Sequence, residues 1–311
     1  MGTPRRSKLI PDGMEERWAS VAGARLRYLA GGGGPSLVLI HGIAASSFSF
    51  RLNCSELSKH FRLFVPDLLN VGYSDRVAEL DGSLHATAGR LLEFLDQAGI
   101  GTADILGSSH GGALVMELAA LAPTRFRRMI LVSPANPFAN RYDRVLKFYL
   151  GNAGGMFMRL VPFLPGRLWD YGIGRMYGDP ARMTKGTGIG HAHPLRIPGT
   201  MPYLLSSLRT FSDDIEGLRP KLPAIARIPT LLMWGDRDPV VEFQSAHPLQ
   251  QALEADLIVL PGVGHLPYEE TPAEFNRELL DYLHNRSPQS VFDRKPGADS
   301  GARRALANTR T

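Results

Sequence analysis

The sequence predicts an α/β fold in which a mostly parallel central sheet is flanked by helices on both faces. Short apolar runs, typical of strands buried on both faces, alternate with longer segments whose apolar residues recur at helical spacing. This alternation favours parallel strands joined by helical crossovers. The 311 residues, 44% of them hydrophobic, can bury a large core and suit one such unit with an inserted subdomain.

The predicted elements follow one another in a regular order along the chain. Residues 18–30 alternate in polarity around a turn at Ala22-Gly23 and predict a β-hairpin. Further apolar runs predict strands, and segments with apolar residues at helical spacing predict helices. The strands are expected over residues 37–40, 61–65, 103–106, 129–132, 230–234 and 257–260, and the helices over residues 46–59, 84–98, 113–122, 243–253 and 272–283.

The alternation of strands and helices is interrupted once. It stops after the predicted strand at residues 129–132 and resumes with the strand at residues 230–234. We therefore expect a core of residues 17–133 and 224–285, with a helical cap over residues 134–223 inserted after the sixth strand.

The predicted cap is rich in large apolar side chains and in cations. We expect most of the apolar side chains to pack inside the cap and the remainder to line an apolar substrate pocket. Between Arg141 and Phe211, ten basic residues stand against three acidic ones, which predicts a solvated basic face. Two other roles of this excess of basic residues remain open. An arginine could bind a carboxylate of the substrate, or the cap could rest on an anionic lipid surface. The apolar side chains include Met156, Phe163, Tyr171, Tyr177 and Tyr203.

The two ends of the chain differ in composition from the core. Residues 1–16 are expected to form an N-terminal extension, and residues 286–311, with six basic and two acidic residues, a disordered basic tail. The basic residues of the tail are not interleaved with aromatic residues, and the tail carries no binding motif, so no nucleic-acid partner is expected. No signal-peptide-like or membrane-spanning apolar stretch is present, which favours a cytoplasmic protein without a transmembrane segment. The one cysteine, Cys54, excludes an intramolecular disulfide and is expected in the core.

The most informative motif is Gly107-Ser108-Ser109-His110-Gly111, which lies between an apolar run ending at Leu106 and a predicted helix. Glycines on both sides of a serine at a strand-to-helix turn allow a turn so sharp that the central side chain stands exposed at the carboxyl end of the strand. Only Ser109 occupies the central position, and it is the candidate nucleophile. The alternative is a serine that merely caps the helix.

With this motif the chain resembles the α/β-hydrolase superfamily, and the resemblance covers residues 17–285. One motif would be weak, but five occur in the order that this superfamily shows. The resemblance implies the α/β-hydrolase fold and a catalytic triad in the chain order Ser, Asp, His, with no organic cofactor. The motifs are His41-Gly42, Pro66-Asp67-Leu68 followed by Gly72-Tyr73-Ser74-Asp75, the serine turn, Gly235-Asp236-Arg237-Asp238, and Gly264-His265.

Two residues are expected to assist Ser109 by this resemblance. An alcohol needs a base to become a nucleophile, and His265, in a loop after the last strand, suits that role because its ordinary pKa is about 6.5. Asp236 and Asp238 both follow the strand over residues 230–234, and the superfamily's spacing selects Asp238 to hold the imidazole. Asp236 remains the alternative acid.

The same resemblance implies an oxyanion hole made of two backbone N–H groups, those of Ile43 and His110. The side chain of His41 precedes a glycine turn and is expected to be structural. His191 and His193 form a pair without a third ligand at a recognisable spacing, so no metal site is predicted.

These residues predict a serine hydrolase that cleaves carboxylic esters through an acyl-enzyme intermediate. Its expected partner is a small-molecule ester that is largely apolar. If an arginine of the cap binds a substrate carboxylate, the ester is also anionic. Dehalogenases and epoxide hydrolases of the superfamily place an aspartate at the nucleophile, so Ser109 argues against both. A carbon–carbon bond hydrolase of dienoate ketones, a cofactor-free perhydrolase or haloperoxidase, an acyltransferase and a small-molecule receptor remain alternatives.

Overall fold

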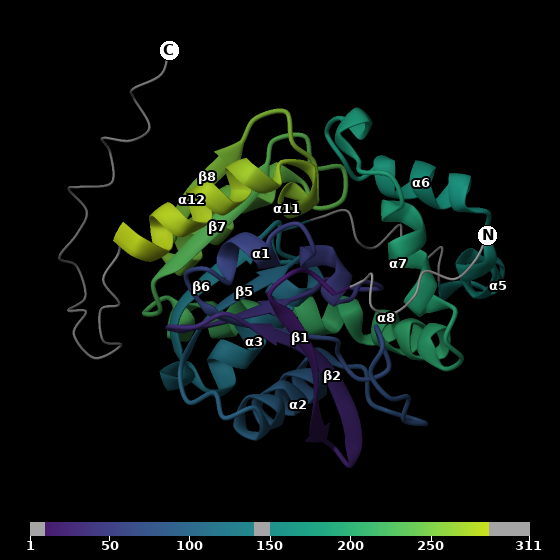
Figure 1. Cartoon of the computed structure of the whole chain (residues 1–311), viewed down its shortest axis with the longest axis horizontal. Coiled ribbons are helices and arrows are strands. Elements are labelled where there is room, and N and C mark those ends of the chain that lie inside the picture. The colour runs from purple at the N-terminus through teal and green to yellow at the C-terminus, as the bar shows by residue number, and fades with distance from the viewer. Residues whose placement is uncertain (1–9, 140–149, 286–311) are drawn as a thin grey trace.

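A computed structural model describes residues 10–139 and 150–285 of the chain (Figure 1). The tail predicted over residues 286–311 lies outside the described residues, as do residues 1–9 of the predicted N-terminal extension. An eight-stranded sheet runs through the described chain. Helices cover both of its faces, as the alternating pattern of the sequence predicts.

The sheet has the strand order β1-β2-β4-β3-β5-β6-β7-β8. The β1–β2 and β2–β4 pairs are antiparallel, and every pair from β4 to β8 is parallel. The parallel strands therefore place their carboxyl ends at one common edge of the sheet. Their bounds are β1 (Met14–Val21), β2 (Ala24–Gly31), β3 (Ser36–Ile40), β4 (Arg62–Pro66), β5 (Ala103–Ser108), β6 (Phe126–Val132), β7 (Thr230–Gly235) and β8 (Asp256–Leu260).

The helices divide between the two faces of the sheet, as Figure 1 shows. Helices α2, α3, α9 and α10 pack in one apolar core, and α1, α11 and α12 pack in the other. The helices are α1 (Cys54–Leu57), α2 (Leu84–Gln97), α3 (His110–Leu121), α5 (Asn152–Leu160), α6 (Gly166–Gly174), α7 (Thr187–Leu195), α8 (Thr200–Glu216), α9 (Leu222–Ile225), α10 (Ala246–Leu253), α11 (Pro267–Glu270) and α12 (Pro272–Asn285).

Burial on both faces explains the continuous apolar runs. In β3, Val38 and Ile40 point into the core under α2 and α3, while Leu37 and Leu39 point into the core under α1 and α12. Successive strand residues face opposite sides of a sheet, so both sets must be apolar. Cys54 is fully buried in the second core, as predicted.

One predicted helix is wrong. Residues 46–59 do not form a single helix but a 3₁₀ turn, η2 (Ser47–Phe50), followed by the short α1. The Ser46 hydroxyl accepts a hydrogen bond from the backbone N–H of Phe48, and the backbone N–H of Ser47 donates to Asp67 Oδ1 at 2.7 Å. Side chains that satisfy backbone donors in this way compete with the helical hydrogen bonds.

Between β6 and β7 the described chain forms helices α5, α6, α7 and α8, within the stretch predicted as a cap. We call residues 150–216 the insertion. It lies at one end of the molecule in Figure 1, with α5 and α6 farthest from the sheet. The packing predicted for its apolar residues is partly wrong. Tyr177 and Tyr203 are buried, but Met156, Phe163 and Tyr171 are exposed because α5 and α6 leave one face uncovered by the described residues.

Candidate active site

Ser109 stands in a sharp turn between β5 and α3. Its backbone has φ 55° and ψ −123°, in a region that residues with a side chain rarely adopt. The Ser109 N–H donates to the carbonyl of Val132 at the end of β6, at 2.9 Å. The turn is therefore tied to the neighbouring strand and presents the Ser109 side chain at the carboxyl edge of the sheet.

The flanking glycines are required by close packing. A Cβ atom on Gly107 would lie 2.2 Å from the carbonyl oxygen of Gly111. A Cβ atom on Gly111 would lie 2.4 Å from the carbonyl oxygen of His41. Both distances are far below van der Waals contact, and backbone atoms cannot move aside cheaply. The glycines of the motif thus let three loops meet around Ser109.

We expect Gly111→Ala to lower the free energy of unfolding by about 3 kcal/mol, because the added methyl group collides with the backbone of β3. Urea denaturation followed by circular dichroism measures this change. Gly89→Ala is the matched control, since a Cβ atom on this exposed residue of α2 meets nothing within 4 Å. The control should stabilise the protein by about 0.5–1 kcal/mol. Equal effects of the two substitutions would show that the turn tolerates a side chain at Gly111.

His265 and Asp238 form a buried pair. The His265 Nδ1 atom lies 2.8 Å from Asp238 Oδ2, and the two residues are 1% and 8% exposed. The other carboxylate oxygen, Oδ1, accepts the N–H groups of Val240 at 2.8 Å and Val241 at 3.0 Å. The alternative acid, Asp236, is exposed and accepts the N–H of Gly262 instead. The geometry therefore brings together His265 and Asp238, the pair that the sequence selects.

The loop that carries His265 lies beside the serine turn. Ser109 follows β5, Asp238 follows β7 and His265 follows β8, so all three stand at the carboxyl edge of the parallel strands. The Ser108 hydroxyl donates to the Tyr268 hydroxyl at 3.2 Å, and this hydrogen bond joins the serine turn to the α11 segment just after His265.

The loop after β3 passes directly against Ser109. A Cβ atom on Gly42 would lie 3.3 Å from the Ser109 Cβ and 3.9 Å from its Oγ atom. Ile43 follows Gly42 in this loop, and His110 is the first residue of α3. The first N–H groups of a helix have no acceptor within the helix. The two backbone groups predicted to bind an oxyanion thus belong to two segments that adjoin Ser109, the loop after β3 and the start of α3.

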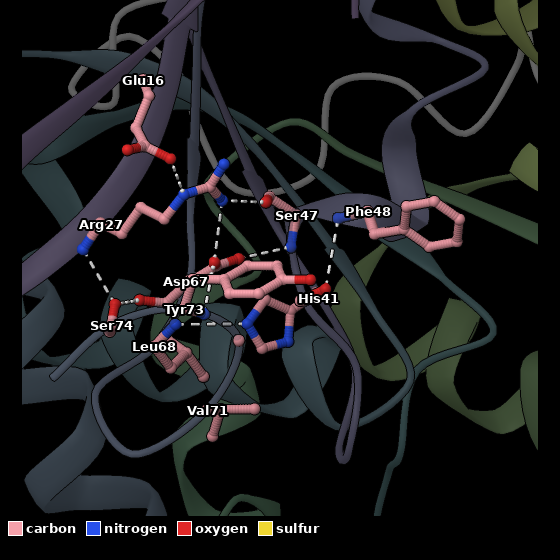
Figure 2. Close-up of polar contacts among 12 residues, drawn as sticks. Glu16, Arg27, His41, Ser47, Phe48, Asp67, Leu68, Val71, Tyr73 and Ser74 are labelled. Atoms are coloured by element: carbon pink, nitrogen blue, oxygen red, sulfur yellow. Dashed lines mark hydrogen bonds and ion pairs between the residues drawn. The ribbon is translucent and has the colours of Figure 1, made fainter. Parts of the chain in front are cut away.

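A buried ion network holds the loop after β3 in place (Figure 2). Asp67 is fully buried, and its carboxylate accepts the N–H groups of Ser47 and Tyr73 at 2.7 and 2.8 Å. Arg27 donates to the same carboxylate at 2.9 Å, and Glu16 accepts from the other side of the guanidinium at 2.7 Å. Asp67, which entered the sequence analysis only as part of a motif, is therefore the residue that fixes two loops at the candidate site.

Two histidines next to Ser109 are structural, as expected for His41. The His41 Nε2 atom accepts the N–H of Leu68, and its Nδ1 atom lies 2.8 Å from the carbonyl oxygen of Gly42. Burial lowers the pKa of His41, and it lowers the pKa of His110 to about 4. Both rings are therefore neutral at pH 7, and His265 is the histidine that pairs with a carboxylate at the sheet edge.

Two buried glutamates near His265 were missed by the sequence analysis. Glu270 Oε2 accepts the N–H groups of Gly264 at 2.8 Å and Gly178 at 2.9 Å, and its Oε1 accepts the N–H of Asp179 at 2.9 Å. One carboxylate thus links the loop before His265 to the insertion. The sequence pattern that could have pointed to Glu270 is the pair of acidic residues, Glu269-Glu270, directly after an apolar segment.

Glu269 joins the insertion to the core through side chains. Its carboxylate lies 2.8 Å from both His191 Nε2 and Arg51 Nη1, and it accepts the Tyr177 hydroxyl at 3.2 Å. Burial opposes the charged form of Glu269, but His191 and Arg51 outweigh it and hold the pKa of this carboxyl below its ordinary value. The insertion is therefore fixed to the core within five residues of His265.

Catalysis by a cysteine thiolate or by a metal ion finds little support in the described residues. Burial raises the pKa of the Cys54 thiol to about 12, so it carries no thiolate at neutral pH. His193 lies beside the Tyr73 hydroxyl at 3.1 Å, while His191 binds Glu269. In residues 10–139 and 150–285, no cluster of three or more His, Cys, Asp or Glu side chains could hold a metal ion. Within the same ranges, no helix combines the length and apolar character needed to cross a membrane.

Comparison with known proteins identifies the family of this chain. A model of the alpha/beta hydrolase family matches residues 37–278, well over half of the chain. The chain belongs to this family. This α/β hydrolase is accordingly an enzyme of the hydrolase class, with the fold predicted from its motifs.

Individual relatives of this α/β hydrolase are distant. An uncharacterized protein of Mycobacterium tuberculosis is 29% identical over 309 residues, covering 93% of this chain and 85% of that protein. Lipase 3 of Moraxella sp. (strain TA144) is 26% identical over 246 residues, covering 76% of this chain and 73% of the lipase. The structure of Cfl2 from Burkholderia cenocepacia aligns with a TM-score of 0.77 at 22% identity, covering 90% of this chain and 97% of Cfl2, which shows the shared fold.

Proposed function

We propose that this α/β hydrolase cleaves carboxylic esters through an acyl-enzyme formed on Ser109. The observation that carries the proposal is the buried His265–Asp238 pair, 2.8 Å apart, on the sheet edge where the strained Ser109 turn also stands. A hydroxyl, a carboxylate and an imidazole at the carboxyl ends of β5, β7 and β8 are the groups that acyl transfer requires. The likeness to Lipase 3 of Moraxella supports an ester as the substrate class.

In the proposed reaction, the Ser109 hydroxyl attacks the ester carbonyl and gives its proton to His265 Nε2. The resulting imidazolium is stabilised by Asp238, which lies at the opposite ring nitrogen. His265 then returns the proton to the departing alcohol, and an acyl-enzyme remains. A water molecule, deprotonated by His265, attacks the acyl-enzyme, and the carboxylic acid leaves as the proton passes back to Ser109.

The negative oxygen of each tetrahedral intermediate would be bound by the backbone N–H groups of Ile43 and His110. Both residues belong to segments that adjoin Ser109, and His110 adds the positive end of the α3 dipole. Such donors contribute about 10²–10³ in rate each. The Asp67 network would serve catalysis indirectly, because it holds the loop that carries Ile43.

The insertion would act as the cap of this enzyme and set its substrate. Contacts of Glu269 and Glu270 hold it within a few residues of His265. The ring of Phe211, in α8, stacks 5.9 Å from the ring of His110, the residue after the proposed nucleophile. An apolar side chain at this place favours acyl groups that are themselves apolar.

The direct test is hydrolysis of p-nitrophenyl esters from acetate to long acyl chains by the full-length protein. We expect turnover that depends on acyl length, with a burst of p-nitrophenol equal to the enzyme concentration where deacylation is slow. A p-nitrophenyl phosphonate should label Ser109 alone, as peptide mass spectrometry would show. Absence of turnover on every ester, with the fold intact, would reject the ester proposal, and dienoate ketones would then be the substrates to assay.

A further inference from the structure

The most exposed large apolar side chains of the described chain lie together on the insertion. Five such side chains are more than half exposed, and all five fall within residues 156–171. They follow one another along α5, the 3₁₀ turn η4 (Val161–Phe163) and α6. We call them the apolar patch: Met156 at 66%, Leu160 at 60%, Phe163 at 68%, Leu168 at 51% and Tyr171 at 68%.

Within each helix, the spacing of the patch residues places them on one face. Met156 and Leu160 are four residues apart in α5, and Leu168 and Tyr171 are three residues apart in α6, so each pair lies on one side of its helix. Phe163 stands in η4 between them. Figure 1 shows α5 and α6 at the outer end of the insertion, away from the sheet.

Two hydrogen bonds fix the backbone segments that carry the patch relative to one another. The Trp169 indole N–H donates to the carbonyl of Val161 at 3.1 Å and ties α6 to η4. Arg196, just after α7, donates to the carbonyl of Pro162 at 2.7 Å and ties η4 to the rest of the insertion. The apolar side chains are therefore presented by a preformed surface, which lowers the entropic cost of docking.

Basic residues outnumber acidic ones in the segment that carries the patch. Residues 150–178 contain three arginines and one acid. Arg159, Arg167 and Arg175 are all exposed. The acid, Asp170, is half-buried and accepts the N–H of Gly188 at 3.2 Å. The segment over residues 150–178 thus combines exposed cations with exposed apolar side chains and has no exposed carboxylate.

We propose that the outer face of α5, η4 and α6 docks on an anionic lipid bilayer. Apolar side chains can enter the acyl boundary of a bilayer while arginines bind the phosphate groups at its surface. Two copies of this chain meeting through the same face would bring like charges together, which disfavours self-association as the reason for the patch.

Docking in this way places the candidate site near the lipid. Met176, two residues after α6, accepts the N–H of His265 at 2.7 Å, so the patch and the catalytic loop are joined by a short stretch of chain. Lipid docking stands independently of the ester proposal, because it depends on α5, η4 and α6 and on no catalytic residue.

The test is sedimentation of the full-length protein with sucrose-loaded vesicles. We expect binding to vesicles of phosphatidylcholine mixed with phosphatidylglycerol, weaker binding to phosphatidylcholine alone, and release at high salt. The double variant Leu160→Ser, Phe163→Ser should bind the mixed vesicles at least about tenfold more weakly, since two large apolar groups no longer enter the bilayer. The control Leu121→Ser, Val259→Ser removes exposed apolar side chains outside the insertion and should bind like the wild type.

The remaining outcomes overturn the proposal. Wild-type protein that stays in solution with the mixed vesicles has no lipid-docking face. If the wild type and the double variant bind the vesicles equally tightly, the lipid contact lies elsewhere on the chain. Light scattering provides the third outcome: a wild-type dimer that becomes a monomer in the double variant, without vesicle binding, assigns the patch to a second copy. Unchanged circular dichroism of the variants establishes that each is folded.

Discussion

Ser109→Ala is expected to reduce kcat for ester hydrolysis by about 10⁴-fold or more while the protein remains folded. The substitution removes only the Oγ atom that the proposal makes the nucleophile. Alanine keeps the Cβ atom and the backbone of the turn, whose strained φ of 55° exists already in the wild type. Hydrolysis of the p-nitrophenyl ester that the wild type cleaves fastest measures the loss, and the thermal midpoint measures the fold.

The matched control is the neighbouring Ser108→Ala. Ser108 carries the same hydroxyl one residue earlier, but its Oγ atom is buried and donates to Tyr268. Losing one buried hydrogen bond costs about 1 kcal/mol of stability and should change kcat less than about tenfold. If Ser108→Ala abolished turnover and Ser109→Ala did not, the nucleophile would be misassigned. If neither variant lost activity, another group would perform the chemistry.

The parts of the fold that the sequence predicts well are those with a local cause. Residues 37–40 are apolar at every position because β3 is covered on both faces, and this pattern needs no knowledge of the partners. The serine turn is also visible in a short stretch of sequence, and the need for Gly107 is local, because a Cβ atom there would collide with Gly111 of the same turn. The need for Gly111 comes from the close approach of His41 in another loop. Asp238 and His265 could be chosen because the resemblance to α/β hydrolases implies an acid and a histidine at these positions after two recognisable strands.

The parts that escaped prediction depend on contacts between distant segments. Glu270 and Gly178 are 92 residues apart, and nothing local in the sequence pairs this carboxylate with the insertion. The missing helix over residues 46–59 has the same origin, because Ser47 donates to Asp67 from another loop. The exposure of Phe163 likewise depends on which helices happen to cover η4. A local sequence pattern indicates which residues need a hydrogen-bond partner or a covering helix. Only the folded structure shows which distant residues provide these contacts.

Asp238→Asn is expected to lower kcat by about 10⁴-fold, through the orientation of a proton rather than through loss of structure. Asp238 Oδ1 accepts the N–H groups of Val240 and Val241, so the carbonyl oxygen of an asparagine must take that side. Its NH₂ group then faces His265 Nδ1, where Asp238 Oδ2 lies at 2.8 Å in the wild type. An imidazole that accepts at Nδ1 carries its proton on Nε2, and it cannot take the proton of Ser109.

Asp236→Asn is the control that separates the two candidate acids. Asp236 is exposed, and its Oδ1 atom accepts the N–H of Gly262 at 2.7 Å, a hydrogen bond that an asparagine oxygen can keep. Its kcat should stay within about threefold of the wild type. A large loss in Asp236→Asn with an active Asp238→Asn would transfer the role of the acid to Asp236. Equal and small losses in both would mean that His265 acts without a carboxylate, although the buried Asp238 lies against its ring.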